Sequence, residues 1–348
     1  MRVFTLDESH AWDETVRSFP HYDVYYLSGY VKAFKIHGDG EPLLFYYESD
    51  TFRAADVVMK RDVALDRHFK GLLPEGKYFD LATPYGYGGW IADKEDVSNE
   101  DKNKLFGEYL DYCRENGIIS DFVRFHPLLG NNRLSDGFYE VIPLGKTVAI
   151  DLSDKDGIWT NMKSECRNRI RKAINSGVTV HHGSASELYE TFRSIYNSTM
   201  DDDNAENYYY FGEQFYNSVR EDLNGNAEVF YAVREGKTIA STIMLYADDR
   251  LNFHLGGSLR EDQCYAPTNL IFYEAALWGC ERGLKTLHLG GGVGSSDDNL
   301  MRFKRSFYRG DYNQFYIGRA VLNRDEYDRL CAMRTDDISS GYFPAYRA

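Results

Sequence analysis

The chain has 348 residues, an apolar share of 43% and a formal net charge of −14. A single hydrophobic core stops growing at roughly 250 to 300 residues, so this length predicts two domains. The acidic balance argues against wide, non-specific binding of nucleic acid, although a small local basic site is compatible with it. No run approaches the ~18 consecutive apolar residues of a membrane span, and residues 1–10 lack the order of a signal peptide. We therefore expect a cytoplasmic protein.

The five cysteines are odd in number, widely scattered and never spaced C-x-x-C. This pattern predicts neither a disulfide framework nor a zinc site, and we expect reduced, mostly buried thiols. No motif calls for a metal or a cofactor.

The first half of the chain alternates strand-like and helix-like segments. Residues 42–47 and 54–59 are apolar runs of strand length, residues 102–114 have the pattern of an amphipathic helix, and residues 122–125 resemble a strand. Such alternation predicts an α/β or α+β layer architecture for a first domain over residues 1–150.

The second half begins with a strand near residue 150 and one long basic helix over residues 155–173, which ends at Asn175-Ser176-Gly177. Two further helices, three meander strands between residues 228 and 256, a helix from about Pro267, a strand and a last helix complete the order.

Several motifs in this half together resemble the FemABX peptidyltransferases, a family with the GNAT fold. They are Trp159-x-x-Met162 with the basic run 167–173, Tyr209-Tyr210-Phe211, the run 254–258, the run 288–292, and Phe303-Lys304-x-x-Phe307. The likeness covers most of residues 150–320 and is more diffuse earlier, where residues 30–32 and 84–89 carry it.

The resemblance implies two tandem GNAT-like domains with mixed sheets flanked by helices, and an acceptor cleft between them. These would be residues 1–150 and 151–319, and residues 320–348 could pack back on the first. Members of this kind transfer an amino acid from aminoacyl-tRNA to the peptide of a cell-wall precursor. We therefore expect an aminoacyltransferase of peptidoglycan biosynthesis with its donor site in the second domain.

A basic stripe stands out in this acidic chain. Lys163, Arg167 and Arg171 recur every four residues, so on one helix they share a face. Arginine binds phosphate in a bidentate fork and lysine binds it as a point charge, so the stripe predicts a phosphate site for a nucleotide-linked acceptor. The alternative is a solvated helix face.

Lys304 is the predicted catalytic residue. Periodicity alone would make Phe303 and Phe307 a buried stripe with Lys304 snorkelling beside it. The resemblance instead implies a lysine close to the reacting carbonyl, where a fixed ammonium stabilises the oxyanion formed when an amine attacks an ester or thioester.

Two segments are predicted to contact the donor. Gly291 and Gly292 follow a strand, but the run meets neither the dinucleotide nor the P-loop pattern, so we expect a close backbone approach to a ligand or to residues 297–299. Thr268 and Asn269 open a helix after Pro267, with Thr268 able to cap it. The preceding loop lacks the glycine-rich pattern of GNAT proteins that bind CoA, which disfavours that donor.

Acceptor contacts are implied by the resemblance at Lys32, Tyr85, Tyr209, Tyr210 and His254. The tyrosines near 209 are equally explained as core residues, and satisfied core histidines are commoner than reactive ones. Two other functions stay open: an acyl-CoA-dependent N-acyltransferase acting on a small amine or amino sugar, and a non-catalytic GNAT-like binding module.

Overall fold

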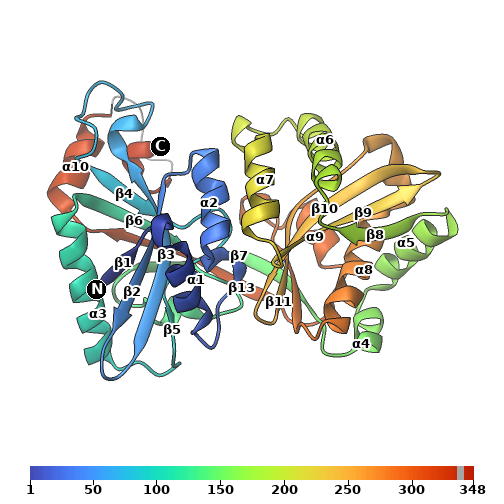
Figure 1. The fold of residues 1–348 in the computed structure, drawn as a ribbon, viewed down its shortest axis with the longest axis horizontal. Helices are drawn as coiled ribbons and strands as arrows, with labels where there is room; N and C mark the ends of the chain where they lie inside the picture. Colours follow the sequence, from blue (N-terminus) through green and yellow to red (C-terminus); the bar gives the residue numbers. More distant parts are fainter. Residues whose placement is uncertain (335–340) are drawn as a thin grey trace. The chain divides into compact units, whose positions relative to one another are not determined.

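In a computed structural model, the chain forms two compact units, each built from a β-sheet and helices (Figure 1). The structure describes residues 1–334 and 341–348. The first unit comprises Met1–Leu144 and Phe315–Ala348, and the second comprises Gly145–Gln314. The alternation of strands and helices confirms the predicted α/β architecture with mixed sheets. None of the described helices is both long and apolar enough to cross a membrane.

The sheet of the first unit has the strand order β1-β2-β3-β4-β6-β13, with β5 also paired to β3. The pair β4 and β6 is parallel, and the other pairs are antiparallel. The strands are β1 (Arg2–Phe4), β2 (Glu41–Glu48), β3 (Arg53–Asp62), β4 (Phe79–Ala82), β5 (Ile91–Ala92), β6 (Ile118–Arg124) and β13 (Asn313–Val321).

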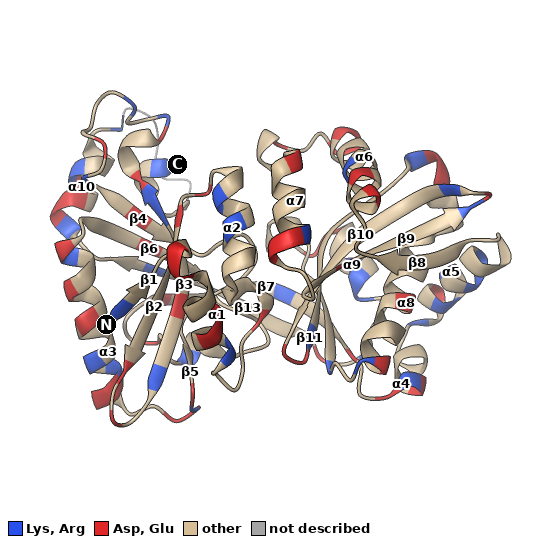
Figure 2. Cartoon of the chain, in the orientation of Figure 1, with Lys and Arg blue, Asp and Glu red and all other residues tan. Residues whose placement is uncertain are grey.

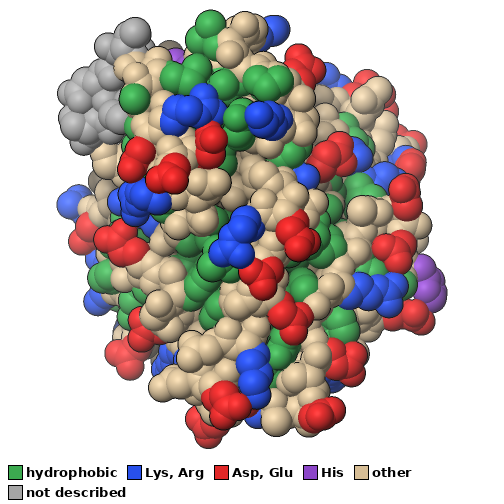
Figure 3. All heavy atoms as spheres, turned by 90° about the vertical axis from the view of Figure 1, so that its left-hand side faces the viewer, with side chains coloured by type: hydrophobic (Ala, Val, Ile, Leu, Met, Phe, Trp, Pro, Cys, Tyr) green, Lys and Arg blue, Asp and Glu red, His purple; other side chains and the backbone are tan. Residues whose placement is uncertain are grey.

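The described residues of the first unit form four α-helices: α1 (Ser9–Arg17), α2 (Ser28–His37), α3 (Asn99–Glu115) and α10 (Arg324–Ala332). Helix α3 begins where the Ser98 hydroxyl accepts a hydrogen bond from the Asp101 amide at 3.1 Å, an ordinary N-cap. Its apolar face contributes to the core of the sheet. On the face of this unit that carries α3 and α10, acidic and basic side chains are interspersed (Figures 2 and 3).

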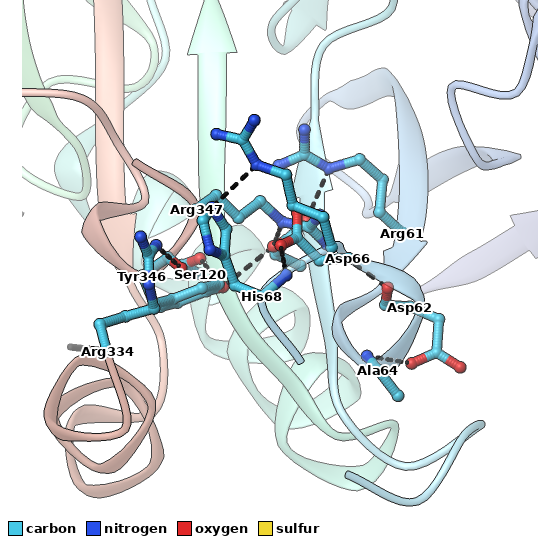
Figure 4. A network of polar contacts seen from close by, with 11 residues as sticks. Arg61, Asp62, Ala64, Asp66, His68, Ser120, Arg334, Tyr346 and Arg347 are labelled. Carbon is cyan, nitrogen blue, oxygen red and sulfur yellow. Dashed lines mark hydrogen bonds and ion pairs between the residues drawn. The ribbon is translucent and has the colours of Figure 1, made fainter. Parts of the chain in front are cut away.

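The last residues of the chain are held on the first unit by buried charges (Figure 4). Arg347 Nε donates to Asp80 at 2.5 Å, and Arg347 Nη1 donates to Asp66 at 2.9 Å. Asp80 has no exposed surface and also accepts from Arg61 at 2.6 Å and from the Tyr346 hydroxyl at 3.0 Å. These contacts fix the C-terminal segment against β3 and β4.

The sheet of the second unit has the strand order β7-β12-β11-β10-β9-β8. Only β11 and β12 are parallel, because a helix connects them. The strands are β7 (Glu140–Asp151), which enters this unit from the first, β8 (Thr179–Gly183), β9 (Ala227–Arg234), β10 (Lys237–Ala247), β11 (Arg250–Ser258) and β12 (Thr286–Gly290).

The helices of the second unit lie on both faces of its sheet. One group of helices contributes buried residues to a core shared with the strands. In a second group, α6 packs on β10 and β11 and lies beside α7. The first group is α4 (Lys155–Thr160), α5 (Ser164–Asn175), α8 (Pro267–Glu281) and α9 (Asn299–Lys304), and the second is α6 (Ser186–Asp202) and α7 (Glu213–Asp222).

The single helix predicted over residues 155–173 is wrong, because the chain breaks between α4 and α5. Lys163 is extended, with φ −64° and ψ 150°, and serves as the N-cap of α5. The Arg167 guanidinium replaces the lost helical bonds, since its Nη1 donates to the carbonyls of Met162 at 2.5 Å and Thr160 at 3.4 Å.

Candidate functional site

A split in the second sheet defines the candidate site. Strands β11 and β12 pair only from Arg250 to Asn252 on β11, although β11 continues to Ser258. On its other side, β11 carries one extra residue opposite β10 at His254, a β-bulge. Within the described residues, the second half of β11 therefore has no partner strand on the side of β12.

Lys304 lies at the end of α9 with its ammonium buried near this split. Its side chain is only 5% exposed, so it does not snorkel to solvent. Nζ donates to the Gly291 carbonyl at 2.7 Å and lies 5.5 Å from the centre of the Phe253 ring on β11. The short helix is aimed by Asp298, whose carboxylate caps it by accepting from the Met301 amide at 2.8 Å.

The charge of Lys304 is expensive to bury at this position. Burial lowers its pKa to about 8, and the Asp298 carboxylate opposes this shift. At neutral pH the side chain is therefore mostly an ammonium that is easier to deprotonate than an ordinary lysine. An ammonium has three N–H donors, and Gly291 accepts from only one of them.

The Phe253 ring beside Lys304 belongs to an aromatic cluster. Phe303 and Phe307 lie 5.2 Å apart, and Phe272 of α8 contacts both at 5.9 and 5.4 Å. Phe253 packs on Phe272 at 5.0 Å. Burial of the ammonium strengthens its electrostatic interactions, because the local dielectric constant is lower than that of water.

The glycine loop after β12 positions the Gly291 carbonyl, which accepts the hydrogen bond from Lys304. A Cβ atom at Gly291 would lie 2.8 Å from the Lys146 carbonyl oxygen, and one at Gly292 would lie 2.5 Å from Asp298 Oδ1. The loop thus needs glycine to fold back on the start of α9. At Gly292 the structure shows the expected close approach to residues 297–299. The donor contacts predicted for Gly291 and Gly292 stay a prediction.

His254 is placed too deep for ordinary proton transfer. Burial lowers its pKa to about 3, so the imidazole is neutral and a very weak base. It occupies the bulge that accompanies the split, which gives it a role in the shape of β11.

The first turns of α5 and α8 meet beside the segment of Lys304. The Lys163 amide donates to the Ser306 carbonyl at 2.9 Å, and Asn269 Nδ2 donates to Cys166 Sγ at 3.8 Å. The predicted capping by Thr268 is wrong: Ala266, at φ +57°, is the N-cap of α8 and no side chain caps it. Asn269 is buried and Thr268 is half-buried, so of these two residues only Thr268 is accessible to solvent.

The remaining predicted residues have surroundings of their own in the two units. Arg171 is exposed and lies 5.1 Å over the Trp159 ring, and Tyr209 is exposed. The Tyr210 hydroxyl donates to Asp201 at 2.8 Å. Lys32 is exposed on α2 and Tyr85 stacks on Phe34 at 5.4 Å, both in the first unit. Each of these assignments stays a prediction.

Arg124 of the first unit is a candidate that the sequence reasoning missed. The half-buried guanidinium donates through Nε to the Gly86 carbonyl at 2.9 Å and lies 5.2 Å from the Phe315 ring. In the described part of the chain, no carboxylate lies within 4 Å of it. A partly buried cation without an anion is costly, and this makes Arg124 an anion-binding candidate. Its hydrogen bond to Gly86 is a tertiary contact across 38 residues, so the sequence offered no signal for it.

The sequence of this chain is similar to a known transferase domain and to a known alanyltransferase. An acetyltransferase (GNAT) domain model matches residues 160–305, which include α5, the split strands and Lys304. The UDP-N-acetylmuramoylpentapeptide-lysine N(6)-alanyltransferase of Weissella viridescens is 25% identical over 356 residues, covering 95% of this chain and 99% of that protein.

Solved structures agree in fold. The crystal structure of FemX matches with a TM-score of 0.66 at 15% identity, covering 94% of this chain and 99% of that one. The structure of L-PGS from Bacillus licheniformis matches with a TM-score of 0.58 at 14% identity, covering 90% and 92%. The match to the GNAT domain model lies within the second unit. These findings confirm the resemblance to the FemABX peptidyltransferases that the motifs carry.

Proposed function

We propose that the chain transfers an aminoacyl group from aminoacyl-tRNA to an amine of a cell-wall peptide precursor. The observation that carries this proposal is the buried Lys304 ammonium, held at 2.7 Å from the Gly291 carbonyl beside the split of β11 and β12. The alanyltransferase of similar length, named for a UDP-linked muramoylpentapeptide-lysine, supplies the classes of donor group and acceptor.

The chemistry is a direct transfer. The acceptor amine attacks the ester carbonyl, a C–N bond forms, and the C–O bond to the terminal ribose breaks. The ribose hydroxyl takes a proton and the amine loses one, so no net proton is consumed. Lys304 donates a free N–H to the oxyanion of the tetrahedral intermediate, and the ammonium is already in place before charge develops.

The donor loop before α8 favours tRNA over CoA. Residues 260–266 form a short helix, η6 (Arg260–Tyr265), and then Ala266. The segment contains no glycine, and the Tyr265 ring is covered by Arg234 at 4.0 Å. Side chains therefore occupy a place where a CoA-binding protein of this fold has bare backbone for the pyrophosphate.

The test of the proposal is a product assay. The protein is mixed with charged tRNAs and a UDP-linked muramyl pentapeptide, and mass spectrometry looks for the acceptor plus one aminoacyl residue. Acylation from acyl-CoA instead would establish the first alternative. Binding of the acceptor without product, for every charged tRNA tried, would favour the non-catalytic module.

The pH profile of turnover should report on Lys304. Because the ammonium is the active form and its pKa is about 8, kcat should be level below pH 8 and fall above it. Lys304→Arg, which stays charged, should move this alkaline limb upward. The measurement is kcat at saturating substrates from about pH 6 to 10. A kcat that rises through pH 8 would mean that Lys304 acts as a neutral base.

The contribution of Lys304 to stability changes with pH in the opposite direction to this alkaline loss. The folded-state pKa of Lys304 lies below its ordinary value near ~10.4, so burying the charge destabilises the fold below pH 8. That penalty is relieved as pH rises from about 8 toward the unfolded value. The contribution of this group to folding therefore improves over the range where activity should fall.

Arg124 is proposed to bind an anionic group of the acceptor. Arg124→Met should raise KM for the acceptor about tenfold or more with little change in kcat, as expected for a lost charge-assisted hydrogen bond of ~1.5 to 3 kcal/mol. Arg133→Met, which removes an exposed arginine of the same unit, should leave KM unchanged. Equal KM values for wild type and Arg124→Met would reduce Arg124 to a packing residue.

A further inference from the structure

A cluster of cations lies next to Lys304 in the second unit, and we name it the basic edge: Lys163, Arg302, Arg305 and Arg309. Lys163, Arg302 and Arg309 are exposed, and Arg305 is half-buried. The hydrogen bond from the Lys163 amide to the Ser306 carbonyl, at 2.9 Å, holds the start of α5 against the segment 302–309. Figure 2 shows Lys and Arg gathered on α5 and α9.

The basic edge is largely unneutralised by the protein itself. Arg305 Nη1 pairs with Asp297 at 2.8 Å, but among the described residues no carboxylate lies within 4 Å of Lys163, Arg302 or Arg309. Some exposed cations elsewhere are paired, as Lys104 is with Glu100 at 2.8 Å. In a chain with a net charge of −14, an unneutralised cluster of this kind favours a polyanionic partner.

Aromatic rings are interleaved with these cations. The Arg305 guanidinium lies 4.8 Å from the centre of the Tyr312 ring. A Cβ atom at Gly310 would lie 2.5 Å from the Tyr308 hydroxyl, so the glycine lets this ring pack on the backbone. Both tyrosines are half-buried. Cations that contact phosphates and rings that stack on bases are together the features that bind single-stranded nucleic acid.

We propose that the basic edge binds the phosphates of the single-stranded 3′ end of an RNA donor. The inference rests on the proposed function, and it adds the surface that guides the ester toward Lys304. Arg302 and Arg305 flank Lys304 in the sequence, so phosphate contacts at these residues bring the terminal ribose close to the buried ammonium.

Charge reversal tests the proposal by RNA binding. An RNA hairpin with a single-stranded 3′ tail, labelled with a fluorophore, is titrated with protein over a salt series. Arg302→Glu with Arg309→Glu should weaken binding about tenfold or more and make the dependence of log affinity on log salt shallower by roughly 1.4, about 0.7 for each lost phosphate. A blunt-ended hairpin should lose much less affinity through the same change.

The matched control carries the same charge change on another surface. Lys104→Glu with Arg114→Glu reverses two exposed cations on α3, where acidic and basic groups are mixed (Figure 3). This variant should bind the tailed hairpin as the wild type does. Equal losses in both variants would mean general electrostatics and would overturn the proposal.

Two donors separate this inference from the proposed function. The ratio of kcat/KM for aminoacyl-tRNA to kcat/KM for 3′-aminoacyl adenosine, which has no phosphate, should fall about tenfold in Arg302→Glu with Arg309→Glu. An unchanged ratio in an active enzyme would overturn the inference and leave the proposed function intact. If the change instead weakens only the nucleotide-linked acceptor, the basic edge is an acceptor site and the inference is wrong.

Discussion

Lys304→Met should lower kcat by at least ~100-fold while the Kd of the acceptor stays within a few-fold. The lysine is 5% exposed, donates a hydrogen bond to the Gly291 carbonyl at 2.7 Å and lies 5.5 Å from the centre of the Phe253 ring. An oxyanion forms only in the transition state, so a donor to it affects turnover and not ground-state binding. Methionine retains the length of the side chain and removes the charge. The measurement is single-turnover kinetics with calorimetry of acceptor binding.

Two controls make the result specific. Lys285→Met removes an exposed lysine of the same unit and should leave kcat unchanged. Thermal unfolding shows whether Lys304→Met is folded under assay conditions. Turnover equal to that of the wild type in a folded Lys304→Met would contradict a catalytic role and make Lys304 a structural residue that holds the Gly291 carbonyl.

Lys304 could be singled out as a candidate from the sequence because its motif is local, and its catalytic role stays a prediction. Two phenylalanines one helical turn apart predict a buried stripe, and the resemblance assigns the lysine between them to the reaction. Periodicity alone predicts snorkelling, and this is wrong, because Asp298 caps α9 in an orientation that aims Lys304 at the Gly291 carbonyl. That carbonyl depends on a glycine loop whose conformation is set by contacts with residues far along the chain.

The basic stripe shows where periodicity fails. Nothing between residues 155 and 173 resembles a strong helix stop, so one helix was the natural prediction. The break depends on Arg167, which satisfies carbonyls at the end of α4 with its side chain. Because a side chain competing with the helix ladder has no signature in hydrophobic spacing, the sequence could not indicate it.

The split sheet and Arg124 depend on tertiary structure. The bulge at His254 exists only relative to the partner strand β10, and a single strand's pattern does not reveal an extra residue. Arg124 sits at the end of β6, where alternation predicts only an exposed or half-exposed position. Its significance is that no described carboxylate lies within 4 Å of it, which is a property of the folded chain.

The C-terminal anchor carries the largest expected effect on stability. Arg347→Met should lower the free energy of unfolding of the first unit by about 2 to 4 kcal/mol, because it leaves the fully buried Asp80 with one ion-pair partner fewer. Asp80 keeps Arg61 at 2.6 Å, so the loss should stay below that of a carboxylate left entirely unpaired. Denaturant unfolding followed by a probe in the first unit measures it.

A double-mutant cycle tells the ion pair apart from lost packing. If Arg347 acts through Asp80, then Arg347→Met should cost much less in an Asp80→Asn background, since the buried charge is already gone. Arg324→Met is the matched control: its partner Asp328 lies at 3.8 Å and both side chains are more than 60% exposed, so about 0 to 1 kcal/mol is expected. Equal losses for Arg347→Met in both backgrounds would show that Arg347 stabilises the unit by packing. The substitution Arg347→Met is costly because Asp80, the partner of Arg347, is fully buried.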